Sequence, residues 1–426
     1  MTTQNVEERD YYTDLTVLKN PYEYFEEMFS KGPVHQLTKH DVLLVTGYAE
    51  ALEVLGNSKD FSAAIAVDLG ITPLPFEPVG DDISDQIESH RHKWNGGDYM
   101  VAFDGARHTA LRSIVNRLFV PSRMKANEDF MFEFADQLVK EAVAKGGCEL
   151  VNQIATPYVT LVIADLMGVP PEDRDLFRKI IDDAPPPGNM ERNETLSPAA
   201  HPLAQMALYF MRYLEDRRAN PRSDVLTDLA TAKFPDGSTP EIIDLVKLAG
   251  FMFGAGQDTT AKLIGNAMRF IVETPGLQQR LRQNRELIPS FIEEVLRIEG
   301  SVKAISRLTR RDTRIGNVDV PKGKRVVIAL AAGNRDPRRW DKPKQLMLDR
   351  PKVREHIAFS RGAHTCVGAP LARAETRIIL ERFFDHTSEI SFSEPKHGPP
   401  GNTHFDYEPS YIVRGLANLH LELTPN

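Results

Sequence analysis

One of the two cysteines in this 426-residue sequence lies in a glycine-rich stretch, FSRGAHTCVGAPLAR. Gly362 precedes Cys366 by four residues, and Gly368 follows it by two. Glycine permits positive φ angles and lets the backbone lie close against a flat or bulky group. A helix rich in Ala, Leu and Arg is expected to begin directly afterwards, and its free N–H groups and dipole would favour a thiolate.

Such a cysteine is most often a small buried apolar side chain, but a thiolate held in this way has three chemical uses. As a nucleophile it needs a base within reach, and His364 lies in the same stretch. As a zinc ligand it needs about three further protein ligands, whereas only His356 and His364 are near it. A single cysteine on a glycine loop suits haem iron, which takes one axial thiolate.

The stretch resembles the cysteine loop of the cytochromes P-450. Phe359, Gly362, Cys366 and Gly368 meet the family pattern FxxGxxxCxG, which PLAR follows. The resemblance implies a mainly α protein with a minor β region, folded as a triangular helical prism around one long central helix. It also implies that Cys366 is the axial ligand of a b-type haem, which Phe359 and Gly368 help to hold. Ser360 is a departure, because bacterial members often carry glycine there.

A second stretch, LAGFMFGAGQDTTAK, places an acid and an alcohol among apolar residues. Alone, Asp258 and Thr259 are an ordinary polar turn of a core helix, although a Thr hydroxyl there can bond to a carbonyl one turn earlier. AGQDTT closely resembles the oxygen-binding motif of the same family. The resemblance implies that Thr259 supports dioxygen and Asp258 relays protons. Phe251 and Ala255 share a helix face with Asp258, so we expect them to line the pocket over the haem.

The remaining motif residues are charged. Glu294 and Arg297 lie three residues apart in EEVLR, a spacing that by itself indicates a weak surface pair. By resemblance they are the buried ExxR pair that fixes the loop NRDPRRW. Haem propionates need cationic partners. By the same resemblance, four residues supply them: His108, Arg112, Arg307 and His364.

The elements that must position these residues are mostly helices. Periodicity predicts them at 21–32, 48–56, 151–168, 172–183, 201–219, 277–284, 286–299 and about 367–386, with two more in 104–145 and a long one at about 240–273. VHQL and DVLLVTG indicate one hairpin, and RIGNVDVPKGKRVVIAL indicates another that turns at Pro-Lys-Gly. Residues 390–423 resemble short strands.

Two long irregular segments, residues 63–100 and 182–205, are expected to be substrate-access loops. No repeat or linker divides the sequence, so residues 1–426 are expected to form a single domain. Further pocket walls are expected from three apolar residues: Ile305, Ile412 and Val413.

Composition narrows the class of protein. The sequence is 41% hydrophobic and 26% charged, which is typical of soluble proteins. A net charge of −8 argues against a broad nucleic-acid surface. The polar start does not resemble a signal peptide, and no apolar run approaches about 20 residues, so we expect no membrane association. Two cysteines suggest a reducing, cytoplasmic location.

We therefore expect a monooxygenase that inserts one atom of O₂ into a hydrophobic terpenoid, steroid, fatty acid or aromatic compound, by hydroxylation or epoxidation. Its electrons would come from a separate ferredoxin and reductase, docked against Arg112, Arg373 and Arg377. Three alternatives remain open: a haem-thiolate peroxygenase that uses peroxide directly, a non-enzymatic haem sensor, and a colourless cysteine hydrolase.

Overall fold

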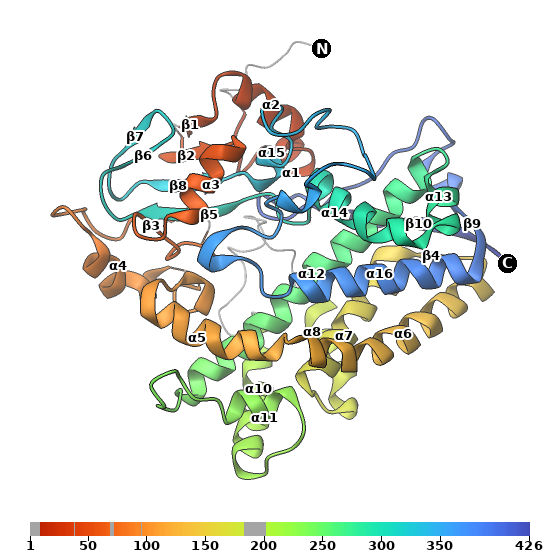
Figure 1. Ribbon diagram of the computed structural model, residues 1–426, viewed down its shortest axis with the longest axis horizontal. Helices are drawn as coiled ribbons and strands as arrows, with labels where there is room; N and C mark the ends of the chain where they lie inside the picture. The colour runs from red at the N-terminus through yellow and green to blue at the C-terminus, as the bar shows by residue number, and fades with distance from the viewer. Residues whose placement is uncertain (1–8, 38, 69–71, 95, 183–201) are drawn as a thin grey trace.

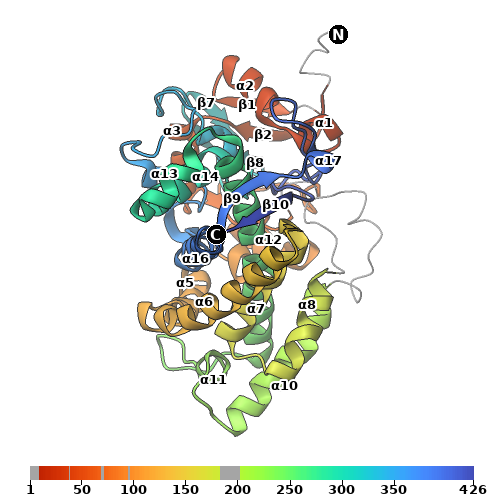
Figure 2. The same ribbon diagram turned by 90° about the vertical axis from the view of Figure 1, so that its right-hand side faces the viewer.

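Helices make up most of the protein, and the strands form small sheets (Figure 1). The computed structural model describes residues 9–37, 39–68, 72–94, 96–182 and 202–426. The five-stranded sheet lies beside α2 and α3, and most of the long helices lie on its other side (Figures 1 and 2). The expected class, mainly α with a minor β region, is confirmed.

The helices fall close to where periodicity predicts them. Their bounds are α1 (Leu15–Lys19), α2 (Tyr22–Ser30), α3 (Tyr48–Gly56), α4 (Ser84–His90), α5 (Gly105–Leu118), α6 (Pro121–Ala144), α7 (Thr156–Met167), α8 (Arg174–Asp182), α10 (Pro202–Ala219), α11 (Val225–Ala230), α12 (Ile242–Glu273), α13 (Leu277–Gln283), α14 (Ile288–Glu299), α15 (Leu330–Gly333), α16 (Ala369–His386) and α17 (Glu394–His397). Pro121 begins α6 at a position where its missing N–H costs nothing. We did not predict the short helices α1, α4, α11, α15 and α17, although Asp14 and Asp224 cap the N-termini of α1 and α11.

The strands form three sheets. Their bounds are β1 (Val34–Leu37), β2 (Val42–Val45), β3 (Phe61–Ser62), β4 (Gly147–Glu149), β5 (Ile305–Thr309), β6 (Thr313–Ile315), β7 (Val318–Val320), β8 (Arg325–Ile328), β9 (Thr387–Phe392) and β10 (His420–Pro425). The five-stranded sheet has the order β1-β2-β8-β5-β3, and the second sheet has the order β4-β10-β9. The predicted β1–β2 hairpin is confirmed, with Val34 opposite Val45.

The predicted hairpin around Pro-Lys-Gly is wrong. The chain turns earlier, at Gly316, whose φ of 55° lies in the left-handed region that favours glycine. Strand β6 pairs with β7 across this turn. Strand β8 instead joins the five-stranded sheet, parallel to β2 and antiparallel to β5. All its residues are buried, so it needs partners on both edges rather than a hairpin mate.

The long central helix is α12, which crosses the helical part of the molecule (Figure 1). Its 32 residues would span about 48 Å at the usual helical rise. It packs against α7, α10, α14 and α16. Because α16 follows the cysteine loop and α14 carries Glu294 and Arg297, this packing brings the predicted motifs together.

The first of the two expected access loops differs in part from the prediction. Residues 63–100 are not wholly irregular, because they contain α4 and a 3₁₀ turn at Arg91–Lys93. Tyr99 packs against Phe251 of α12, with ring centroids 5.4 Å apart, so this segment does reach the central helix. Of residues 182–205, those from 183 to 201 lie outside the described residues. In the described part of the chain, no helix combines the length and apolarity needed to cross a bilayer.

Candidate active site

The cysteine loop is closed by its own backbone and wedged against α3. The Cys366 N–H donates to the Phe359 carbonyl at 2.9 Å, which folds the residues between them into a tight loop. Gly362 has a φ of 73°, and a Cβ on it would overlap the Leu55 carbonyl at the end of α3. Glycine is therefore required at this position by both conformation and space, as the sequence indicated.

The sulfur of Cys366 faces the start of α16. The N–H groups of Gly368 and Ala369 and the positive charge of Arg112 favour its thiolate, although burial is the larger effect and raises its pKa. The residue is nevertheless exposed. Gly368 adopts an ordinary φ of −78°, so of the two glycines Gly362 and Gly368 only Gly362 uses the positive φ that glycine permits. A Cβ on Gly368 would lie 3.9 Å from the Cys366 sulfur, which is an ordinary van der Waals contact.

Four basic residues meet near this loop. His108 and Arg112 lie on α5, Arg307 on β5 and His364 in the loop itself. The rings of His108 and His364 are 4.1 Å apart, and Arg112 donates to the Thr365 carbonyl at 2.6 Å. Asp104 is the acid beside them, 3.8 Å from His364.

These basic residues fit an anionic group. Among the described residues, neither Arg112 nor Arg307 forms an ion pair, although Arg307 is buried. Burial and the nearby His364 and Arg112 charges lower the pKa of His108 to about 4, and its buried Nε2 lacks a partner in the described chain. Uncompensated buried cations are costly unless an anion pairs with them. Two propionates would supply such charge, so the residues present fit the haem that the sequence led us to expect.

The acid and the alcohol lie on one side of α12. The Thr259 hydroxyl donates to the Ala255 carbonyl at 3.0 Å, one turn earlier, as predicted. Ala255 is exposed and Phe251 half-buried, whereas the intervening Met252 and Phe253 are buried. One face of an otherwise packed helix is thus accessible next to Thr259.

Sequence reasoning missed three polar residues around this pair. The Ser301 hydroxyl donates to the Thr259 carbonyl at 2.6 Å. Asp258 forms an ion pair with buried Lys262, which also lies 3.0 Å from Glu408. The four-residue spacing from Asp258 to Lys262 is a detectable helix signal, but nothing in the sequence connects Ser301 or Glu408 to them.

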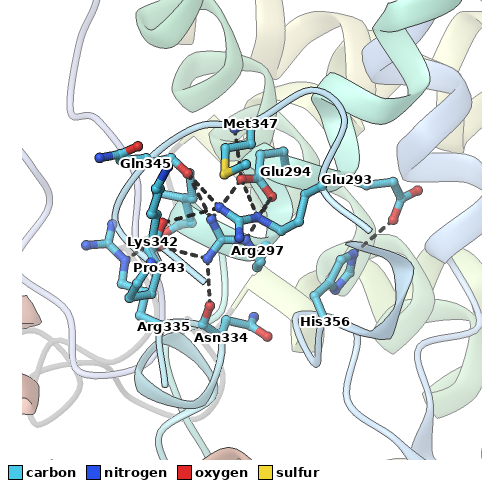
Figure 3. Close-up of polar contacts among 12 residues, drawn as sticks. Glu293, Glu294, Arg297, Asn334, Arg335, Lys342, Pro343, Gln345, Met347 and His356 are labelled. Carbon is cyan, nitrogen blue, oxygen red and sulfur yellow. Dashed lines mark hydrogen bonds and ion pairs between the residues drawn. The ribbon is translucent and has the colours of Figure 1, made fainter. Parts of the chain in front are cut away.

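Glu294 and Arg297 form a fully buried pair, not the surface pair that the spacing alone suggests (Figure 3). Arg297 contacts both Glu294 oxygens at 2.8 Å and also donates to the carbonyls of Asn334, Pro343 and Gln345. All five guanidinium N–H groups therefore have acceptors. Glu294 in turn accepts from Arg350 at 2.8 Å. The pair thus holds the residues 334–345 segment in place.

The neighbouring Glu293 fixes the other side of the cysteine loop. It accepts from His356 at 2.9 Å and from Arg373 at 2.5 and 2.9 Å. Burial opposes its charge, but these hydrogen bonds hold the pKa of Glu293 at about 2. Arg373 is therefore neutralised, and Arg377 likewise pairs with Glu381 and Glu128. Two members of the expected basic docking patch thus already have acidic partners.

The remaining predicted pocket residues lie on adjacent chain segments, but Ile305 and Ile412 pack against different hydrophobic clusters. Val302 and Val413 form an antiparallel bridge, and the Lys303 N–H donates to the Ile412 carbonyl at 2.6 Å. Ile305 and Ile412 are half-buried, and Val413 is buried. The chain segments on which we predicted Ile305, Ile412 and Val413 are thus adjacent, while Phe251 packs with Tyr99 elsewhere.

Comparison with known proteins agrees with this geometry. The family described as cytochrome P450 matches residues 177–389. The substrate-free structure of Mycobacterium marinum cytochrome P450 CYP150A6 superposes with a TM-score of 0.91. It is 46% identical and covers 99% of this chain and 100% of its own.

Curated relatives give the same result. The putative cytochrome P450 YjiB of Bacillus subtilis is 30% identical over 88% of this chain and 90% of its own length. The vitamin D(3) 25-hydroxylase of Pseudonocardia autotrophica is 29% identical over 100% of this chain and 99% of its own length. The expected fold is confirmed, and these bacterial relatives together with the family match show that this chain belongs to the cytochrome P450 family of haem-iron monooxygenases.

Proposed function

We propose that this chain inserts one atom of O₂ into a hydrophobic small molecule, with a b-type haem held through Cys366. One observation carries the proposal. One packed set of elements carries the exposed Cys366, an acid–alcohol pair on α12, and two arginines, Arg112 and Arg307, that form no ion pair among the described residues.

Each residue has a role in this proposal. The haem, when bound, would supply oxygen activation. Cys366 would donate its thiolate, which the N–H groups of Gly368 and Ala369 favour. His108, Arg112, Arg307 and His364 would pair with the propionates, while Phe359 would flank the loop.

The acid and the alcohol would deliver protons. Asp258 would carry protons towards the oxygen-binding side, and Thr259 would hold them there by hydrogen bonding. Ala255 and Phe251 would keep that side apolar and limit water entry. Glu294 and Arg297 would act at a distance, by fixing the chain that leads to the cysteine loop.

A hydrophobic substrate is supported by the apolar character of Phe251, Ile305, Ile412 and Val413, which would contact it. Related proteins suggest where to begin. The vitamin D(3) 25-hydroxylase is a relative over the whole chain, and Bacillus megaterium CYP109E1, 27% identical, has been crystallised with testosterone and with corticosterone. We therefore propose a compound of steroid or secosteroid size, hydroxylated at a C–H bond or epoxidised at a double bond.

We further propose a ferredoxin, served by a separate reductase, as the electron donor. Arg112 supports this because it is a cation at the cysteine loop, where a propionate would share its charge. Arg373 and Arg377 contribute less, because acids already neutralise them. We also propose that residues 1–426 act as a single domain in the cytoplasm, where Cys148 and Cys366 would remain the free thiols that the structure shows.

A carbon monoxide difference spectrum tests the proposal. The dithionite-reduced protein should give a strongly red-shifted Soret band that Cys366→Ser abolishes. A panel of testosterone, corticosterone and vitamin D₃ should then be screened for loss of the distal water and for oxygenated product. A histidine-type band or a colourless protein would refute the proposal. Peroxide-driven product formation that Thr259→Ala leaves unchanged, without O₂-driven product, would point to a peroxygenase.

A further inference from the structure

A buried ammonium group beside the proposed proton donor is shared by two carboxylates. Lys262 follows Asp258 by one turn of α12, and its Nζ contacts Asp258 Oδ1. The same Nζ lies 3.0 Å from Glu408 Oε2. The Lys262 side chain is only 4% exposed, against 28% for Asp258 and 20% for Glu408. One positive charge is therefore paired with two negative charges in a region that is only partly exposed to water.

This arrangement depends on a close fit between α12 and the loop that carries Glu408. The Glu408 N–H donates to the Gly415 carbonyl at 3.1 Å, which closes the loop. A Cβ on Gly415 would overlap the Lys262 side chain, so only glycine lets the Lys262 stem pass. Burial disfavours the Lys262 charge, but the two carboxylates together raise its pKa above the ordinary value. Lys262 is thus a fixed cation.

Asp258 is held at one oxygen only. Its Oδ1 contacts Lys262, while its Oδ2 is buried without a hydrogen-bond partner among the described residues. A carboxylate that carries protons must turn between a proton source and an acceptor. If Lys262 had no other partner, turning Asp258 away would leave a buried cation uncompensated. Glu408 removes that obstacle, because it stays beside Lys262 when Asp258 leaves.

We propose that Glu408 and Lys262 are positioning residues for the proton relay: Glu408 holds Lys262 so that Asp258 is free to turn. The inference rests on the proposed monooxygenase function and deepens it. Removing the Glu408 charge would leave Lys262 clamped to Asp258, whereas removing Lys262 as well would release Asp258 again. A purely structural role predicts the opposite order of activities, because the double variant would then lose more activity than Glu408→Gln alone.

The test compares Glu408→Gln with the double variant Glu408→Gln/Lys262→Met. Asp406→Asn is the matched control, because Asp406 lies on the same loop and pairs with Lys19 at the surface. The substrate probe is the panel compound that gives the largest spectral shift. Each protein is assayed with O₂ and reductant, in H₂O and in D₂O, and separately with hydrogen peroxide, which already contains two protons.

We expect Glu408→Gln to lower O₂-driven turnover by about tenfold and to raise its solvent isotope effect, with peroxide-driven turnover and the carbon monoxide spectrum unchanged. The double variant should recover most of the loss, and Asp406→Asn should match the wild type. Equal losses with O₂ and peroxide, or no recovery in the double variant, would overturn the inference. A wild type that gives no thiolate-type spectrum and no product from the panel would refute the proposed function itself.

Discussion

Ser360, at the start of the cysteine loop, holds an unfavourable conformation that a single substitution should relieve. Its φ is 60°, in the left-handed region that favours glycine, and its buried hydroxyl has no hydrogen-bond partner in the described chain. Ser360→Gly removes both defects and leaves the Ser360 N–H, which donates to the Ile357 carbonyl at 2.9 Å, in place. We expect the variant to be more stable than the wild type.

The magnitude follows from three opposing contributions. A left-handed conformation costs a residue with a side chain about 1–2 kcal/mol, and an unpartnered buried hydroxyl costs about 1–3 kcal/mol. Glycine loses about 0.5–1 kcal/mol through the greater freedom of the unfolded chain. The net gain is therefore between about 1 and about 4.5 kcal/mol. With an unfolding entropy of about 2.1 cal/mol/K per residue over 426 residues, the thermal midpoint should rise by about 1–5 °C.

Thermal unfolding of the haem-loaded protein, followed by circular dichroism, measures this shift. Ser360→Ala is the internal control, because it removes the hydroxyl but keeps the side chain that opposes a positive φ. The order of midpoints should be Gly above Ala, and Ala at or above Ser. An alanine variant more stable than the glycine variant would show that the backbone at residue 360 is not strained, and the reasoning would fail.

Two further predictions concern buried charges. Arg307→Met should speed haem transfer from the protein to apomyoglobin at least tenfold, because Arg307 is a buried cation. Arg314→Met, which removes one partner of an exposed ion pair in the β6–β7 hairpin, should not speed it. Equal transfer rates in the two variants would contradict a propionate role for Arg307. Burial raises the pKa of Glu375 well above its ordinary 4.5. The unfolded chain therefore releases this proton at a lower pH than the folded chain does. Stability falls as the pH rises from the Glu375 pKa of the unfolded chain to that of the folded chain. As the pH rises above 4.5, Glu375→Gln should therefore gain stability over the wild type, by at most about 1.4 kcal/mol per pH unit in urea unfolding. A pH-independent difference would contradict the shift.

The parts that could be predicted from the sequence are those with a local cause. The tight approach at Gly362 and the back-bonding hydroxyl of Thr259 both follow from residues within one turn or loop. We predicted that β8 pairs with β7, because the residues alternate on both sides of the Pro-Lys-Gly turn. That alternation does not reveal that every residue of β8 is buried, which is why β8 pairs within the five-stranded sheet instead. Glu408 could not be predicted at all, because its contact with Lys262 depends on how the C-terminal loop crosses α12.

At Arg297, the sequence motif and the tertiary structure determine different contacts. The three-residue spacing guarantees only that Arg297 can meet Glu294 on one helix face. A buried ion pair of this kind rarely stabilises a fold more than apolar residues of the same size would. Its retention is better explained by the three backbone carbonyls that Arg297 collects from residues 334–345. A lysine has three donors and no planar fork, so it could not bind Glu294 at two oxygens and these carbonyls together. The charge therefore specifies the path of the chain towards the cysteine loop.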